Sequence, residues 1–97
     1  MIIEKNNHVF HVTGRYSEKW FKNDKLNNWE PQTFHILDYY RNDTDGIYID
    51  IGAWIGPTVL YAAGNYKKVV AIEPDPVAYQ RLVDNIKANK FSNIILY

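Results

Sequence analysis

The sequence predicts an α/β fold built on a small parallel sheet, and three observations support this prediction. Two apolar runs with strand character, 47–51 and 69–73, are separated by a stretch with helical character. A second helical stretch follows the latter run, and a third apolar run begins at Ile94. Strands that alternate with helices pair in parallel through right-handed crossovers. We therefore expect a Rossmann-like partial parallel sheet of three strands with crossover helices, preceded by a short hairpin and a helix.

Length and composition limit the chain to one small domain. Its 97 residues are 46% hydrophobic, which is typical of a globular protein and allows a small core. Eleven basic residues balance eleven acidic ones, so no overall field favours nucleic acid or a membrane surface as a partner. The chain has no cysteine, which excludes disulfides and thiolate metal ligands. Without a signal-peptide pattern or a membrane-spanning run, we expect a cytoplasmic protein.

Residues 1–28 form a lead segment in front of the predicted sheet. Apolar residues on both sides of an Asn-rich turn predict a short hairpin within residues 2–13. His8 and His11 are three residues apart in a strand and therefore lie on opposite faces. That spacing favours partly exposed polar side chains over a metal pair, and we expect no metal site.

The second part of the lead segment has a weaker pattern. We expect Ser17 to cap a short helical turn and residues 22–28 to form a loop. Large aromatic side chains in so polar a setting predict that the segment docks onto the rest of the domain, although they could instead line a substrate mouth. These aromatic residues are Trp20, Phe21 and Trp29.

A helix is predicted from Pro31 to Arg41, because proline suits the first helical position and apolar residues recur at helical spacing. The recurring residues are Phe34, Leu37 and Tyr40. Polar residues at 42–46 then turn the chain into the first strand of the sheet.

The strand at 47–51 runs into a helix at Pro57 through a turn that contains Gly52 and Gly56. Glycine lets the backbone approach a bound group closely, and the N–H groups at a helix start are free donors. Asp50 ends the strand at the edge where open α/β sheets bind ligands. The turn is equally compatible with a plain strand-turn-helix whose glycines serve tight packing.

The run at 69–73 is typical of a parallel strand that is covered on both faces. It ends at Glu73, seventeen residues after Gly56, where dinucleotide-binding folds place the acid that binds ribose hydroxyls. A surface carboxylate beside the next helix, which Asp75 caps and which runs to about Asn89, is the simpler explanation. The joint occurrence of two strand-end acids and the glycine turn favours a nucleoside-binding crevice.

Two segments, 48–56 and 70–76, resemble the first two cofactor motifs of class I S-adenosylmethionine-dependent methyltransferases. They are most similar to the FkbM-type family, in which Asp-hydrophobic-Gly-Ala-Asn-hydrophobic-Gly precedes Glu-Pro-Asn/Asp-Pro. Residues 82–89 resemble that family's next helix, and 29–31 resemble its lead-in. The resemblance covers residues 29–97 and implies the N-terminal half of a Rossmann-like SAM-binding methyltransferase domain.

The resemblance implies S-adenosylmethionine as the cofactor and O-methyl transfer to a small-molecule or glycan hydroxyl. The methionine and sulfonium portion of the cofactor would be held by four residues of the first motif: Asp50, Gly52, Ala53 and Gly56. Glu73 would bind both ribose hydroxyls, and Pro74 and Asp75 would lie along the ribose and adenine edge. No catalytic residue is assigned, because the family's catalytic positions would follow Tyr97.

The sequence departs from the family pattern at Trp54, where the family prefers Asn or Gly because these residues tolerate a left-handed backbone. Either the turn has another conformation, or Trp54 contacts a substrate or partner. Two other functions remain open. A noncatalytic fragment would bind a partner chain or itself through its open sheet. Whatever its function, we expect the chain to form a homo-oligomer through the open sheet edge. An NAD-dependent oxidoreductase is less favoured, because Gly52 and Gly56 do not fit Gly-x-Gly-x-x-Gly.

Overall fold

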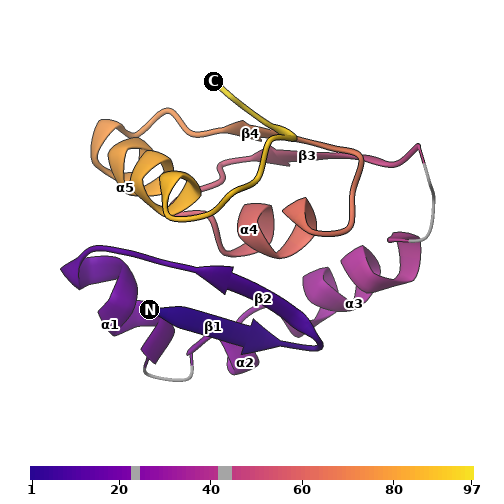
Figure 1. Ribbon diagram of the computed structural model, residues 1–97, viewed down its shortest axis with the longest axis horizontal. Helices are drawn as coiled ribbons and strands as arrows, with labels where there is room; N and C mark the ends of the chain where they lie inside the picture. The colour runs from indigo at the N-terminus through magenta and orange to yellow at the C-terminus, as the bar shows by residue number, and fades with distance from the viewer. Residues whose placement is uncertain (23–24, 42–44) are drawn as a thin grey trace.

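The computed structural model describes residues 1–22, 25–41 and 45–97, which form three layers (Figure 1). A parallel sheet forms one outer layer, the helices α4 and α5 lie beneath it, and an antiparallel hairpin lies on the far side of α4. The predicted α/β class is confirmed. In the described ranges, no helix is long and apolar enough to span a bilayer.

The sheet contains β3 (Ile47–Ile51), β4 (Lys68–Ile72) and β5 (Ile94–Leu96) in the order β3-β4-β5. Both pairs are parallel, as predicted. In the register, Tyr48 lies beside Val69, and Val69 lies beside Ile94. The side chains of every second residue in each strand therefore lie on the same face of the sheet.

Helix α4 (Pro57–Ala63) follows β3 and is buried along its whole length. Helix α5 (Pro76–Lys87) follows β4 and begins as predicted, because the Asp75 carboxylate accepts a hydrogen bond from the Ala78 N–H at 2.8 Å. Leu82 of α5 is fully buried. These two crossover helices lie on the same side of the sheet (Figure 1).

The hairpin pairs β1 (Ile2–Lys5) with β2 (His8–His11), which confirms the predicted N-terminal hairpin. Its turn residues Asn6 and Asn7 have φ values of 50° and 68°, the left-handed conformation that a two-residue hairpin loop requires. The hairpin packs against α4, where the His8 ring of β2 stacks on Tyr61. It leaves the parallel sheet uncovered on the opposite side.

Two asparagines of α5 and the segment after it hold the N-terminal segment in place. Asn85 accepts a hydrogen bond from the Thr13 N–H at 2.8 Å and donates to the Ser17 hydroxyl at 3.1 Å. Asn89 accepts from the His11 N–H and donates to the His11 carbonyl, both at 2.8 Å. The predicted capping role of Ser17 is wrong, because Ser17 lies inside a helix with its hydroxyl bonded to Asn85.

His8 is only 6% exposed, which corrects its interpretation as a partly exposed side chain. Its Nε2 lies 3.0 Å from the Asp38 carboxylate, and its ring stacks on Tyr61 with centroids 3.7 Å apart. These polar partners compensate for the loss of water on burial. His11 is exposed on the opposite face of β2, as its spacing predicts.

In the described part of the segment between the hairpin and β3 there are three helices: α1 (Arg15–Lys22), α2 (Lys25–Asn28) and α3 (Pro31–Tyr40). Helix α2 corrects the predicted loop over 22–28, of which residues 23–24 lie outside the described ranges. Helix α3 has its predicted bounds within one residue, but Tyr40 is 55% exposed and does not join the core. The predicted turn at 42–46 falls mostly outside the described residues.

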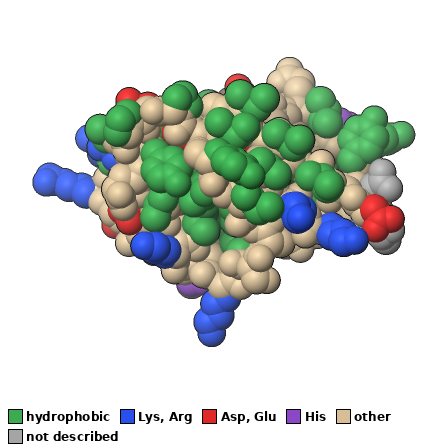
Figure 2. All heavy atoms as spheres, turned by 90° about the horizontal axis from the view of Figure 1, so that it is seen from above, with side chains coloured by type: hydrophobic (Ala, Val, Ile, Leu, Met, Phe, Trp, Pro, Cys, Tyr) green, Lys and Arg blue, Asp and Glu red, His purple; other side chains and the backbone are tan. Residues whose placement is uncertain are grey.

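The face of the sheet opposite α4 is apolar and exposed. Ile47, Ile49 and Ile51 of β3 are 58%, 57% and 79% exposed. Figure 2 shows hydrophobic side chains gathered over this side of the molecule. The prediction that the strand at 69–73 is covered on both faces is therefore wrong, since its second face, which includes Val70, is only partly buried.

Candidate functional site

The turn between β3 and α4 is pinned to the end of β4. The N–H groups of Gly52 and Ala53 both donate to the Ile72 carbonyl, at 2.8 Å and 3.0 Å. The backbone then passes through positive φ at Gly52, Trp54 and Gly56, with values of 81°, 55° and 99°. We call residues 52–56 the glycine turn. It lies at the carboxyl end of the sheet, where the sequence places the crevice.

Glycine suits positions 52 and 56 of the turn for different physical reasons. A Cβ added at Gly52 would meet no atom within 4 Å, so this glycine faces open space. A Cβ at Gly56 would lie 2.7 Å from Leu82 Cδ1, inside the core. Gly56 therefore serves tight packing, whereas Gly52 leaves room for a group to approach the backbone.

Trp54 has the left-handed backbone that its position in the motif predicts, in spite of its large side chain. Its ring packs edge-on against Trp20 with centroids 5.1 Å apart, and it also contacts Tyr16 and Trp29. The first expected explanation, another turn conformation, is wrong, because the backbone at Trp54 is left-handed. The ring packs against the lead segment, and its contact with a substrate or partner stays a prediction. The packing confirms that the lead-segment aromatics dock onto the domain.

Glu73 joins the two loops of the predicted crevice. Its Oε1 accepts the Trp54 N–H at 2.6 Å, and its Oε2 accepts the Asp75 N–H at 2.9 Å. A carboxylate oxygen has two acceptor positions, so each oxygen retains one for a further donor. The half-buried side chain is thus held in one orientation at the carboxyl edge of β4.

Asp50 lies on the face of the sheet that α4 covers, and the Thr58 hydroxyl donates a hydrogen bond to its carboxylate. Burial raises the pKa of the neighbouring Tyr48 hydroxyl, and the Asp50 charge contributes to the increase. A polar cluster of three side chains therefore lies under the glycine turn. The sequence reasoning missed Thr58 and Tyr48, although Thr58 could have been inferred as the second residue of the helix that Asp50 precedes.

The other predicted site residues are divided between core and surface. Ala53 is 3% exposed and its N–H donates to the Ile72 carbonyl, so it contributes to the shape of the turn. Pro74 is exposed beside Glu73, and so is Asp75, whose carboxylate caps α5. No group of three or more His, Cys, Asp or Glu among the described residues has the arrangement of a metal site.

Comparison with known proteins places this geometry in a known fold. A TYW2 from Methanocaldococcus jannaschii, solved in complex with AdoMet, matches 98% of this chain with a TM-score of 0.57 and 24% identity. An aTrm5, solved in complex with tRNALeu, matches 98% of the chain with a TM-score of 0.61 and 24% identity. The chain therefore has the α/β fold of these two proteins.

The matches cover only part of each relative. The chain spans 41% of the TYW2 chain and 26% of the aTrm5 chain. By sequence it is 44% identical over 52 residues to the uncharacterised protein MJ1452 of Methanocaldococcus jannaschii, and the matched region is 54% of this chain and 20% of that protein. No family model matches the chain.

Proposed function

We propose that residues 29–97 are the N-terminal half of a methyltransferase domain of FkbM type that binds S-adenosylmethionine, with residues 1–28 as its lead segment. Glu73 carries this proposal. Its carboxylate is fixed by backbone N–H groups from both loops, and its two remaining acceptor positions match a pair of vicinal ribose hydroxyls. A carboxylate that was only an exposed surface group would not need to be held by hydrogen bonds from both loops.

The glycine turn supplies the second part of the proposed cofactor site. The open space at Gly52 lets the methionine portion approach the Gly52 backbone, next to the Asp50 carboxylate, while the buried Ala53 would act through the shape of the turn. Gly56 would act through the shape of the turn, because its own Cα faces Leu82. Pro74 and Asp75 would form the exposed wall beside the ribose and adenine.

When bound, the cofactor would supply a sulfonium methyl group for in-line transfer to the acceptor, with S-adenosylhomocysteine as the leaving group. The contribution of this chain is to hold the donor in a fixed orientation, which accounts for a large part of the rate of such transfers. We propose a small-molecule or glycan hydroxyl as the acceptor, because basic and acidic residues balance and no overall field favours a nucleic acid. The tRNALeu bound by aTrm5 makes RNA the second acceptor class to test.

The test is calorimetric titration of the chain with S-adenosylhomocysteine, with NAD as the competing ligand. We expect Glu73→Ala to weaken S-adenosylhomocysteine binding by about 10- to 100-fold, because a charged hydrogen-bond acceptor typically contributes about 1.5–3 kcal/mol. Glu4→Ala, an exposed acid on β1, is the matched control and should bind like the wild type. Unchanged affinity in Glu73→Ala would remove Glu73 from the site.

The other titration outcomes separate the alternatives. Binding of NAD in place of S-adenosylhomocysteine would support an oxidoreductase, and binding of neither would support a noncatalytic module. We also propose that the chain forms a homo-oligomer through its open sheet, since the exposed isoleucines of β3 lie beside an unpaired strand edge.

A further inference from the structure

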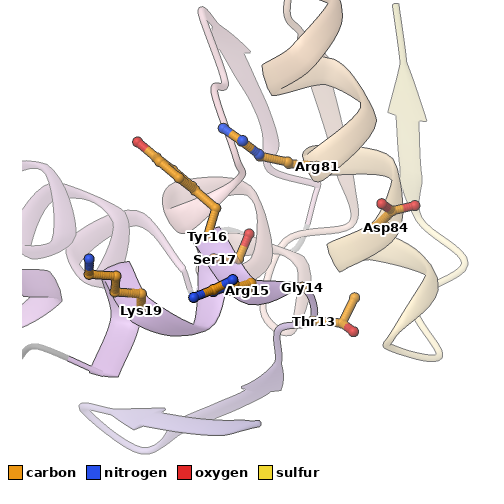
Figure 3. A pocket seen from close by; sticks show the side chains of 8 residues that line it. All are labelled: Thr13, Gly14, Arg15, Tyr16, Ser17, Lys19, Arg81 and Asp84. Atoms are coloured by element: carbon orange, nitrogen blue, oxygen red, sulfur yellow. The ribbon is translucent and has the colours of Figure 1, made fainter.

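A cavity of about 460 Å³ lies between α1 and α5, outside the glycine turn (Figure 3). We call it the α1–α5 cavity. Its charged lining residues are three cations and one acid: Arg15, Lys19, Arg81 and Asp84. The cavity therefore has an excess of positive charge in a chain whose total charge is zero.

The three cations are available to a ligand. Arg15 and Lys19 are four residues apart on α1 and so lie on one side of that helix, while Arg81 comes from α5. Within the described ranges, none of the three forms an ion pair with a protein acid. The one acid of the lining, Asp84, already accepts a hydrogen bond from the Gln80 side chain at 3.0 Å.

Arg81 is held in place by an aromatic ring. Its guanidinium carbon lies 3.9 Å from the centroid of the Tyr16 ring, and Figure 3 shows the Arg81 side chain of α5 reaching toward the Tyr16 side chain of α1. Stacking fixes the plane of the guanidinium and leaves its N–H edge free to form paired hydrogen bonds with a carboxylate or phosphate. Fixing the donor beforehand lowers the entropic cost of binding such a group.

The same ring connects the cavity to the proposed cofactor site. Tyr16 packs edge-on against Trp54 with centroids 6.2 Å apart, and the Trp54 N–H donates to Glu73. A ligand in the cavity would therefore lie one aromatic layer away from the glycine turn. A methyl acceptor anchored in the cavity would have to extend past that layer to reach the donor.

We propose that the α1–α5 cavity binds the anionic group, phosphate or carboxylate, of a small acceptor molecule. The identification of that molecule as the acceptor rests on the proposed methyltransferase function. The volume of the cavity suits a small molecule, and the remainder of the surface has no net positive field that would hold a long polyanion.

The experiment follows the amide signals of the chain by NMR during separate titrations with inorganic phosphate, glucuronate and a single-stranded RNA oligonucleotide. We expect phosphate or glucuronate to shift the amides of residues 14–19 and 80–84. Arg81→Gln should weaken that binding about tenfold, the loss expected for one charged hydrogen-bonding group, and Arg81→Lys should retain part of it. Lys87→Gln, which removes an exposed cation from the last turn of the same helix, should leave it unchanged. Preserved dispersion of the other amide signals shows that each variant is folded.

Each result decides the proposal. Absence of shifts with both small anions would overturn it, and so would equal weakening in Arg81→Gln and Lys87→Gln. RNA binding that is lost in Arg81→Gln, without binding of either small anion, would assign the cavity to nucleic acid instead. Titration with S-adenosylhomocysteine tests the methyltransferase function separately from the anion site. Binding of a small anion without binding of S-adenosylhomocysteine would retain the cavity as an anion site and refute the methyltransferase function.

Discussion

The two faces of the parallel sheet are built from similar strands but have opposite environments. On the face that α4 and α5 cover, Val69 and Ala71 are fully buried. On the other side, Ile49 and Ile51 are more than half exposed. Strand formation depends on the local pattern, whereas burial depends on which side the crossover helices take. A residue's apolar character therefore says little about its contribution to stability until its face is known.

The comparison predicts that substitutions are costly on the helix side and mild on the open side. The largest effect is expected for Gly56→Ala. The new Cβ would lie 2.7 Å from Leu82 Cδ1, and the residue would have to keep a φ of 99°. Overpacking costs about 1–3 kcal/mol and left-handed backbone about 1–2 kcal/mol, so we expect a loss of about 2–5 kcal/mol in the free energy of unfolding. Urea denaturation followed by circular dichroism measures it.

Gly52→Ala is the matched control in the same turn. Its φ of 81° imposes the backbone cost, but no atom lies within 4 Å of the new Cβ. We expect a loss of only about 1–2 kcal/mol. Equal losses in the two variants would contradict the view that Gly56 is a packing residue and Gly52 an open one.

The N-terminal hairpin, and the order and type of the elements from α3 onward, could be predicted from the sequence, because each of them carries a local signal. Pro57 and Pro76 mark helix starts, and the turn residues Asn6 and Asn7 mark the hairpin. The sequence left the backbone at Trp54 open, and the structure shows it to be left-handed, as the family pattern of Asn or Gly at this position favours. These features depend on residues that are close together in the chain.

Features that depend on distant residues could not be predicted. His8 is buried because Asp38 and Tyr61, which lie 30 and 53 residues away, supply its polar contacts. The short helix α2 has a polar sequence and is anchored by one buried side chain, Leu26. In the candidate site, the position of Glu73 was predictable, but its Trp54 N–H donor was not, because that donor comes from a turn 19 residues away that meets Glu73 only in the folded chain.

The second prediction compares adjacent residues of one strand that differ only in their face. Val69 is fully buried on the helix side, and Val70 is partly buried on the open side. Val69→Ala should lower the free energy of unfolding by about 2 kcal/mol, and Val70→Ala by less than about 1 kcal/mol. Parallel denaturation curves give both values. Similar losses in the two variants would mean that the open face is covered in solution.

The smallest effect on folding is expected for Ile49→Glu, and this variant tests whether a second copy covers the open face. Ile49 is 57% exposed in the centre of β3, so the charge should change the free energy of unfolding of one chain by less than about 0.5 kcal/mol. It should nevertheless prevent self-association, because a carboxylate cannot be buried in an apolar contact without a partner. Light scattering coupled to size exclusion should show an assembly for the wild type and for Tyr39→Glu, a control on α3 whose side chain is 74% exposed, and a monomer for Ile49→Glu. A wild-type mass of 11.4 kDa would refute the homo-oligomer.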